Sequence, residues 1–123
     1  MLDFTKIQKD TFLGTLLRLP LRLLPRKITF PILQGPNKGY KWIVRAGIHS
    51  CWLGCYEAFK QKAIVSIFEK HCGKIKVVYD IGAHAGFYSL LFSRLLNKEG
   101  KVFAFEPDVE NFHFLEKHLS LKK

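Results

Sequence analysis

Two acidic residues and two glycines in the second half of the chain have types and spacing that suit the binding of a nucleoside. The stretch YDIGAHAGFYS, residues 79–89, contains Asp80, Gly82 and Gly86, and Glu106 closes the next apolar run twenty residues after the second glycine. Glycines let a ligand approach the backbone closely. A carboxylate at that separation can accept hydrogen bonds from both hydroxyls of a ribose. The alternative is that the glycines serve only a tight turn between a strand and a helix.

The glycine spacing excludes two common nucleotide-binding loops. The dinucleotide fingerprint G-x-G-x-x-G needs glycines two and five positions after Gly82, where this chain has His84 and Phe87. A P-loop is excluded because no Gly-Lys-Ser/Thr follows. The remaining pattern is acid-x-Gly-x-x-x-Gly. An acid at the strand end does not suit a pyrophosphate, but it suits a ligand with an amino or sulfonium group.

The runs around this loop alternate between strand and helix patterns. Residues 75–80 and 101–106 are short apolar runs that each end in an acid, as in buried strands. Residues 86–97 and 108–121 have the periodicity of amphipathic helices, with Asp108 as the expected N-cap of the second. This order predicts an α/β fold with a Rossmann-like, doubly wound parallel sheet and right-handed crossovers. Ligands bind such sheets outside the carboxyl ends of the strands, where the glycine loop is expected.

The stretches VVYDIGAHAGFYSLLFSRL and GKVFAFEPDVENFHFLEKHL resemble the start of the FkbM-type class I S-adenosylmethionine-dependent methyltransferases. The resemblance covers about residues 75–121, and the upstream GIHSCWLGCYE is similar to the segment before the motif in some members. It implies that the chain binds S-adenosylmethionine and belongs to an enzyme that transfers a methyl group to an oxygen of a small molecule or sugar. The residues that match the cofactor site of the family are Asp80, Gly82, Ala83, His84, Gly86, Phe87, Glu106, Pro107 and Asp108.

The resemblance also implies a role for each part of this set. Residues 80–86 would wrap the methionine part of the cofactor, Glu106 would hold the ribose hydroxyls, and Pro107 and Asp108 would flank the adenine. His84 stands where many members have asparagine. The family places its acceptor pocket and any proton-handling residue after the second helix. We therefore assign no catalytic residue and expect no metal.

The predicted organisation has three parts. Residues 1–26 form a basic, amphipathic arm, residues 27–74 a β-hairpin followed by a helix, and residues 75–123 the N-terminal half of a cofactor-binding domain. A doubly wound sheet usually has more than two strands, so we expect a truncated chain that is too short to be active alone. The alternatives are a non-catalytic fragment of such an enzyme and a basic module that binds a membrane or nucleic acid.

The lead-in to the cofactor domain has clear turn and helix signals. Residues 27–33 and 40–45 are strand-like, and QGPNKG between them supplies turn residues. Residues 57–71 have helical periodicity, and Gly73 is the expected stop. The expected apolar face of this helix consists of Phe59, Ala63, Ile64, Ile67, Phe68 and Cys72.

The net charge of +10 is concentrated near the N-terminus. Residues 1–50 carry nine of the 20 lysines and arginines but two of the 10 acids. Such an excess favours anionic partners, yet no nucleic-acid-binding motif is present, so no specific nucleic acid is expected. Residues 12–24 are leucine-rich but too short to span a bilayer. We expect residues 12–27 either to touch a membrane surface weakly or to pack on the rest of the chain. The lack of a secretory signal predicts a cytoplasmic protein, with peripheral membrane contact as the second hypothesis.

Several other side chains suit structural roles better than chemistry. The cysteines Cys51, Cys55 and Cys72 lack the spacing of common zinc sites, which favours buried structural thiols. The aromatic side chains expected in the core are Phe87, Tyr88 and Phe92. The tryptophans expected at the rim of the core are Trp42 and Trp52. The helix histidines expected in solvent are His113 and His118.

Overall fold

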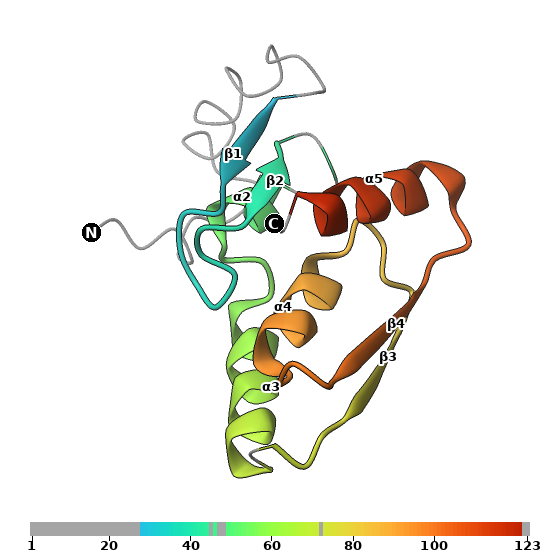
Figure 1. Cartoon of the computed structure of the whole chain (residues 1–123). Coiled ribbons are helices and arrows are strands. Elements are labelled where there is room, and N and C mark those ends of the chain that lie inside the picture. Colours follow the sequence, from blue (N-terminus) through green and yellow to red (C-terminus); the bar gives the residue numbers. More distant parts are fainter. Residues whose placement is uncertain (1–27, 45, 47–48, 72, 122–123) are drawn as a thin grey trace.

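The computed structural model shows a mixed α/β fold (Figure 1). The described residues are 28–44, 46, 49–71 and 73–121. The predicted arm, residues 1–26, and the segment 12–27 expected to touch a membrane lie outside them. Within the described residues the strands form an antiparallel pair and a parallel pair. None of the helices in this part of the chain is long and apolar enough to cross a membrane.

The second half of the chain has the predicted order of strand, helix, strand and helix. β3 (Val77–Ile81) and β4 (Lys101–Phe105) run parallel, and Val77 pairs with Lys101 and Ile81 with Phe105. α4 (Phe87–Leu95) connects the two strands, and α5 (Val109–Ser120) follows the second. The parallel pairing is therefore confirmed. Each helix pattern was also assigned to the correct segment.

The two faces of the β3–β4 pair have different surroundings. The side chains on the face toward α4 are half-buried, namely Val78, Asp80, Val102 and Ala104. The apolar side chains on the opposite face are exposed, namely Val77, Tyr79, Ile81, Phe103 and Phe105. Two of these, Tyr79 and Phe103, stack with ring centroids 5.4 Å apart. Parallel sheets normally have both faces covered, so an exposed apolar face on this strand pair is unusual.

The first half of the described chain opens with the predicted hairpin. β1 (Thr29–Pro31) and β2 (Lys41–Ile43) are antiparallel, with Phe30 opposite Trp42. Both strands are shorter than the patterns at residues 27–33 and 40–45. The turn between them is closed by Gly39, whose N–H donates to the Ile32 carbonyl oxygen at 2.9 Å.

Two helices, α2 (His49–Leu53) and α3 (Ala58–Lys70), connect the hairpin to the parallel pair. The second agrees with the helix predicted at residues 57–71. Its predicted apolar face is wrong in part, because Phe59 is 84% exposed and Ile67 is 53% exposed. Single-sequence periodicity identified the helix but not the side that packs.

A glutamine takes the buried position on α3 instead. Gln61 is 2% exposed. Its side-chain amide donates to the backbone carbonyls of Tyr56 and Gly54, in the turn between α2 and α3. Burial of this polar group is tolerated because it satisfies backbone acceptors that the turn leaves open.

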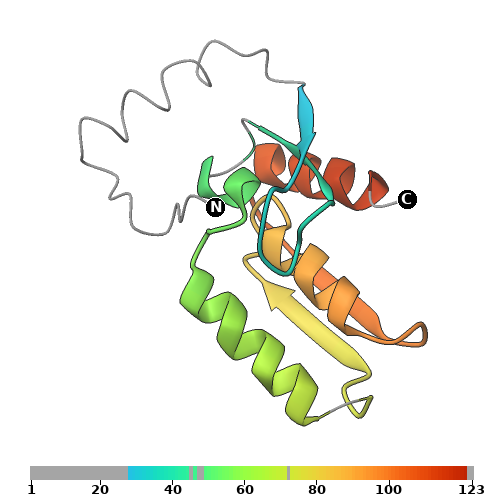
Figure 2. The same ribbon diagram turned by 90° about the vertical axis from the view of Figure 1, so that its left-hand side faces the viewer.

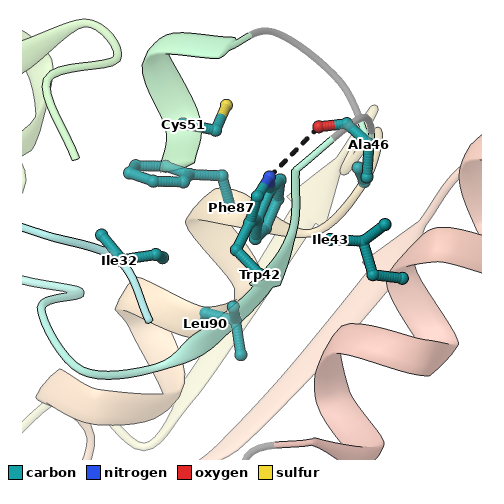
Figure 3. Packing of buried hydrophobic residues seen from close by; sticks show 8 residues of the cluster. Ile32, Trp42, Ile43, Ala46, Cys51, Phe87 and Leu90 are labelled. Carbon is teal, nitrogen blue, oxygen red and sulfur yellow. Dashed lines mark hydrogen bonds between the residues drawn. The ribbon is translucent and has the colours of Figure 1, made fainter. Parts of the chain in front are cut away.

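The core is centred on Trp42, at the junction of the hairpin and α4 (Figure 3). Trp42 is 0% exposed, and its indole N–H donates to the Ala46 carbonyl oxygen at 3.1 Å. The Phe87 ring meets its edge at 5.8 Å between centroids. The expectation that Trp42 lies at the rim was therefore wrong, because the hairpin folds back onto α4. The core position predicted for Phe87 is confirmed.

His118 on α5 completes this core, which corrects the expectation that it faces solvent. It is 0% exposed and stacks on Trp42 with ring centroids 3.8 Å apart. Its Nε2 accepts the Ile43 N–H at 3.0 Å, and its Nδ1 lies 2.7 Å from the Ala85 carbonyl oxygen. Because a backbone N–H only donates and a carbonyl only accepts, the ring is neutral with its proton on Nδ1. Burial lowers the pKa of His118 to about 4.

Candidate functional site

The glycine loop lies at the carboxyl ends of β3 and β4, as the sequence predicted. The N–H groups of Gly82 and Ala83 donate to the carbonyl oxygen of Phe105, at 2.9 and 3.0 Å. Phe105 is the last residue of β4. These two bonds fasten the loop that leaves β3 across the end of the neighbouring strand.

Glu106 stands at the centre of this junction. One carboxylate oxygen, Oε2, accepts the backbone N–H of His84 at 2.7 Å, and the other, Oε1, accepts that of Asp108 at 3.0 Å. The side chain therefore links the glycine loop to the start of α5. A carboxylate has about four acceptor positions, so each oxygen can accept one further hydrogen bond. Two neighbouring oxygens with free acceptor positions suit the two hydroxyls of a ribose.

His84 contributes its backbone rather than its ring to this arrangement. It has a φ of 51°, in the left-handed region, where asparagine, aspartate and histidine are the favoured non-glycine residues. Its side chain is exposed. A histidine at this position is therefore compatible with the backbone conformation that the loop needs.

The two glycines of the loop have different surroundings. A Cβ at Gly82, where φ is +77°, would meet no described heavy atom within 4 Å beyond the adjacent residues. A Cβ at Gly86, where φ is +89°, would come within 2.6 Å of Leu115 Cδ1 on α5. Gly82 thus borders open space that a ligand can occupy, whereas Gly86 allows α4 and α5 to pack closely.

Asp80 lies against the first turns of α4. Its Oδ2 accepts the Ser89 hydroxyl at 2.6 Å. Burial raises the pKa of Asp80, and the bond from Ser89 opposes that shift. Ser89 is 1% exposed, so this pair anchors the end of β3 to the helix below the glycine loop.

The remaining predicted residues divide between packing and capping. The Phe87 ring lies in the core, and Ala83 is 6% exposed. Asp108 is the N-cap of α5, and its side chain accepts the Asn111 N–H at 2.8 Å, as the sequence predicted. Pro107 is exposed between Glu106 and this cap. The structure thus brings the loop, Glu106 and the start of α5 together, while the Phe87 ring packs in the core.

Sequence reasoning missed a second polar cluster beside the loop. The Tyr88 hydroxyl, one residue into α4, donates to Glu57 Oε2 at 2.8 Å, and Lys60 pairs with the other oxygen of the same carboxylate. The Tyr88 ring packs against the core, in line with the prediction from its aromatic character, while its hydroxyl belongs to this cluster. The available signal was the hydroxyl, because a tyrosine that is partly buried usually needs a hydrogen-bond partner.

A cavity among the described residues lies apart from the predicted site. It has a volume of about 440 Å³ and opens between α4, β4 and the end of α5, and none of the nine predicted cofactor residues lines it. The described residues contain no cluster of three or more histidine, cysteine or acidic side chains that could hold a metal ion. Cys51 is buried in the core, as expected, Cys55 is only partly buried, and Cys72 lies outside the described residues.

The chain matches no family model, no curated protein and no solved structure. The resemblance to the methyltransferase family therefore remains a prediction from the motif residues. The geometry of the loop and of Glu106 provides independent grounds on which to judge it.

Proposed function

We propose that this chain carries the first half of an S-adenosylmethionine-binding, Rossmann-like domain of a methyltransferase of the FkbM type. The observation that carries the proposal is the position of Glu106. Its carboxylate lies at the end of β4, holds the glycine loop through the His84 N–H, and retains acceptor positions for two further donors. A plain turn between a strand and a helix does not require a carboxylate from the next strand.

The residues present fit the proposed cofactor. The open space beside Gly82 can receive the chain that joins the ribose to the amino acid. Glu106 would bind the ribose hydroxyls, and the exposed Pro107 would border the adenine. The bound cofactor supplies an electrophilic methyl group on a sulfonium. The part played by this chain is to bind and orient, which is most of what methyl transfer needs.

The exposed face of the parallel pair supports the finer description of the fold. Tyr79, Phe103 and Phe105 form a stack of rings on that face, and each ring is at least 44% exposed. In a doubly wound sheet this face is covered by a second layer of helices. We infer that β3 and β4 are part of a larger sheet of this kind, in which further elements complete the acceptor pocket.

Replacing Glu106 with glutamine is expected to weaken the binding of S-adenosylhomocysteine, the demethylated cofactor, by roughly 10- to 100-fold. The amide keeps one acceptor oxygen for the loop but loses a charge-assisted bond to the ribose, and such bonds contribute about 1.5–3 kcal/mol. Isothermal titration of the purified chain with this ligand measures the effect.

Glu110→Gln is the matched control, because Glu110 is exposed in the first turn of α5 and the charge change is the same. We expect the control to bind like wild type. Tight binding that Glu106→Gln leaves unchanged would show that the assigned ribose contact is wrong. Wild-type binding no tighter than millimolar would favour a non-catalytic fragment.

A further inference from the structure

The Glu57–Tyr88 pair is a polar cluster that the proposed ribose and loop contacts do not use. Glu57 is the N-cap of α3, with φ 45° and ψ 48°, a left-handed conformation that is unusual for this residue. Within the described residues its side chain makes no capping bond to its own helix. The carboxylate instead accepts the Tyr88 hydroxyl on α4 at 2.8 Å. One oxygen of this carboxylate is thus held toward α4, while the other pairs with Lys60 on α3.

The cluster lies at the same end of the sheet as the glycine loop. Tyr88 is two residues beyond Gly86 and belongs to the first turn of α4, which starts where β3 ends. Figure 2 shows α3 and β4 on opposite sides of β3. A ligand whose ribose is held by Glu106 at the end of β4, and which crosses the open side of Gly82, would therefore extend its other end toward Glu57.

The chemistry of the cluster suits a cation at that end. The hydrogen bond from Lys60 is the main cause that lowers the pKa of Glu57; the bond from Tyr88 adds to it, and burial opposes both. The carboxylate is therefore charged at neutral pH. The carboxylate side chain is 30% exposed and Lys60 is 63% exposed. Surface ion pairs of this kind contribute little. A ligand ammonium group can thus take the place of the lysine while Tyr88 keeps the carboxylate oriented.

We propose that Glu57, oriented by Tyr88, binds the α-ammonium group of the amino-acid end of the S-adenosyl ligand. This inference rests on the proposed function and deepens it by naming a residue on α3 that selects ligands with an amino-acid tail. Asp80 is the competing carboxylate; it lies on the helix-facing side of β3, where its Oδ2 accepts the Ser89 hydroxyl. Tyr88 is a positioning residue in this arrangement.

The test uses two ligands that share the adenosine and the sulfur and differ in the amino-acid end, which contains the proposed ammonium contact. S-adenosylhomocysteine carries the amino acid, whereas 5′-methylthioadenosine keeps the adenosine and the thioether but lacks it. In isothermal titrations Glu57→Gln is expected to raise the Kd for S-adenosylhomocysteine roughly tenfold, as for the loss of a charged hydrogen bond. The Kd for 5′-methylthioadenosine should stay at the wild-type value.

Three further variants make the result decisive. Tyr88→Phe keeps the ring and should show the same selectivity with a smaller change, and it replaces Glu57→Gln if that variant does not fold. Glu69→Gln makes the same charge change at an exposed position later on α3, and it should bind both ligands normally. Glu106→Gln should raise the Kd of both ligands by a similar factor, because both contain the ribose.

The possible outcomes separate this inference from the proposed function. If Glu57→Gln weakened the binding of both ligands equally, or of neither, the proposed ammonium contact would be wrong. The proposed ribose site would not be affected by that result. A selective loss in Asp80→Asn instead would assign the contact to Asp80. If the wild-type chain bound neither ligand, the proposed function itself would be wrong, and the inference with it.

Discussion

Acidification from about pH 7 to about pH 4 is expected to remove about 3 kcal/mol of folding free energy through His118 alone. Burial depresses the pKa of this histidine from 6.5 to about 4 in the folded chain. The unfolded chain therefore binds the proton first. The stabilising contribution is complete above about pH 6.5, falls as the pH drops toward 4, and changes no further below that value.

The measurement is urea unfolding followed by tryptophan fluorescence at pH 7.0, 5.5 and 4.5. Carboxylates also titrate in this pH range. The informative quantity is therefore the difference in unfolding free energy between wild type and His118→Phe. The phenylalanine keeps a ring against Trp42 but leaves the Ile43 N–H and the Ala85 carbonyl without their partner. We expect it to cost about 2–4 kcal/mol at pH 7 and much less at pH 4.5.

His113→Gln is the control, because His113 lies on the same helix and is exposed. It should leave both the stability and its pH dependence near wild type. A constant difference between wild type and His118→Phe across this pH range would mean that the imidazole is not buried in its neutral form.

Gly86→Ala is expected to destabilise the fold by about 3 kcal/mol, whereas Gly82→Ala should cost only about 1 kcal/mol. Both positions have positive φ, +89° and +77°, so an alanine is strained at either. Only at Gly86 would the added methyl group also collide with a packed side chain, Leu115 Cδ1. Leu115 is 2% exposed and has little room to move.

Denaturant unfolding of the two variants measures this difference in stability. Titration with S-adenosylhomocysteine should show the opposite order for affinity, with the larger loss in Gly82→Ala. Gly82→Ala places a methyl group in the space assigned to the ligand and should weaken binding more than its small loss of stability implies. In the double variant Gly86→Ala/Leu115→Ala, the loss of stability should be smaller than the sum of the losses in the two single variants, because the smaller side chain at residue 115 removes the collision. Equal costs at the two glycines would show that α4 and α5 do not pack as described.

The order and pairing of the second half could be predicted because its signals are local. Apolar runs of strand length, a glycine before α4 and an aspartate N-cap before α5 are all readable within a few residues. The location of the loop followed from the same order, since carboxyl ends of parallel strands meet at one edge. The sequence also placed Glu106 at the end of the second strand, but it did not predict that the carboxylate holds the loop through His84.

The missed features depend on contacts between segments far apart in the sequence. His118 was assigned to solvent because a single helix pattern does not show that the hairpin packs on α5. Its partner Ile43 is 75 residues away. Glu57 and Tyr88 are 31 residues apart, and each alone resembles an ordinary surface or core residue. Tertiary contacts, and not local preference, decided these positions.

The central claim is that the loop at the end of β3 and Glu106 at the end of β4 together bind an S-adenosyl ligand. The most direct test is a titration of the ¹⁵N-labelled chain with S-adenosylhomocysteine, followed by its backbone amide resonances. The account predicts saturable shifts that centre on Gly82, His84 and Glu106 and that largely disappear in Glu106→Gln. An absence of shifts, or shifts centred on the basic N-terminal segment instead, would contradict it.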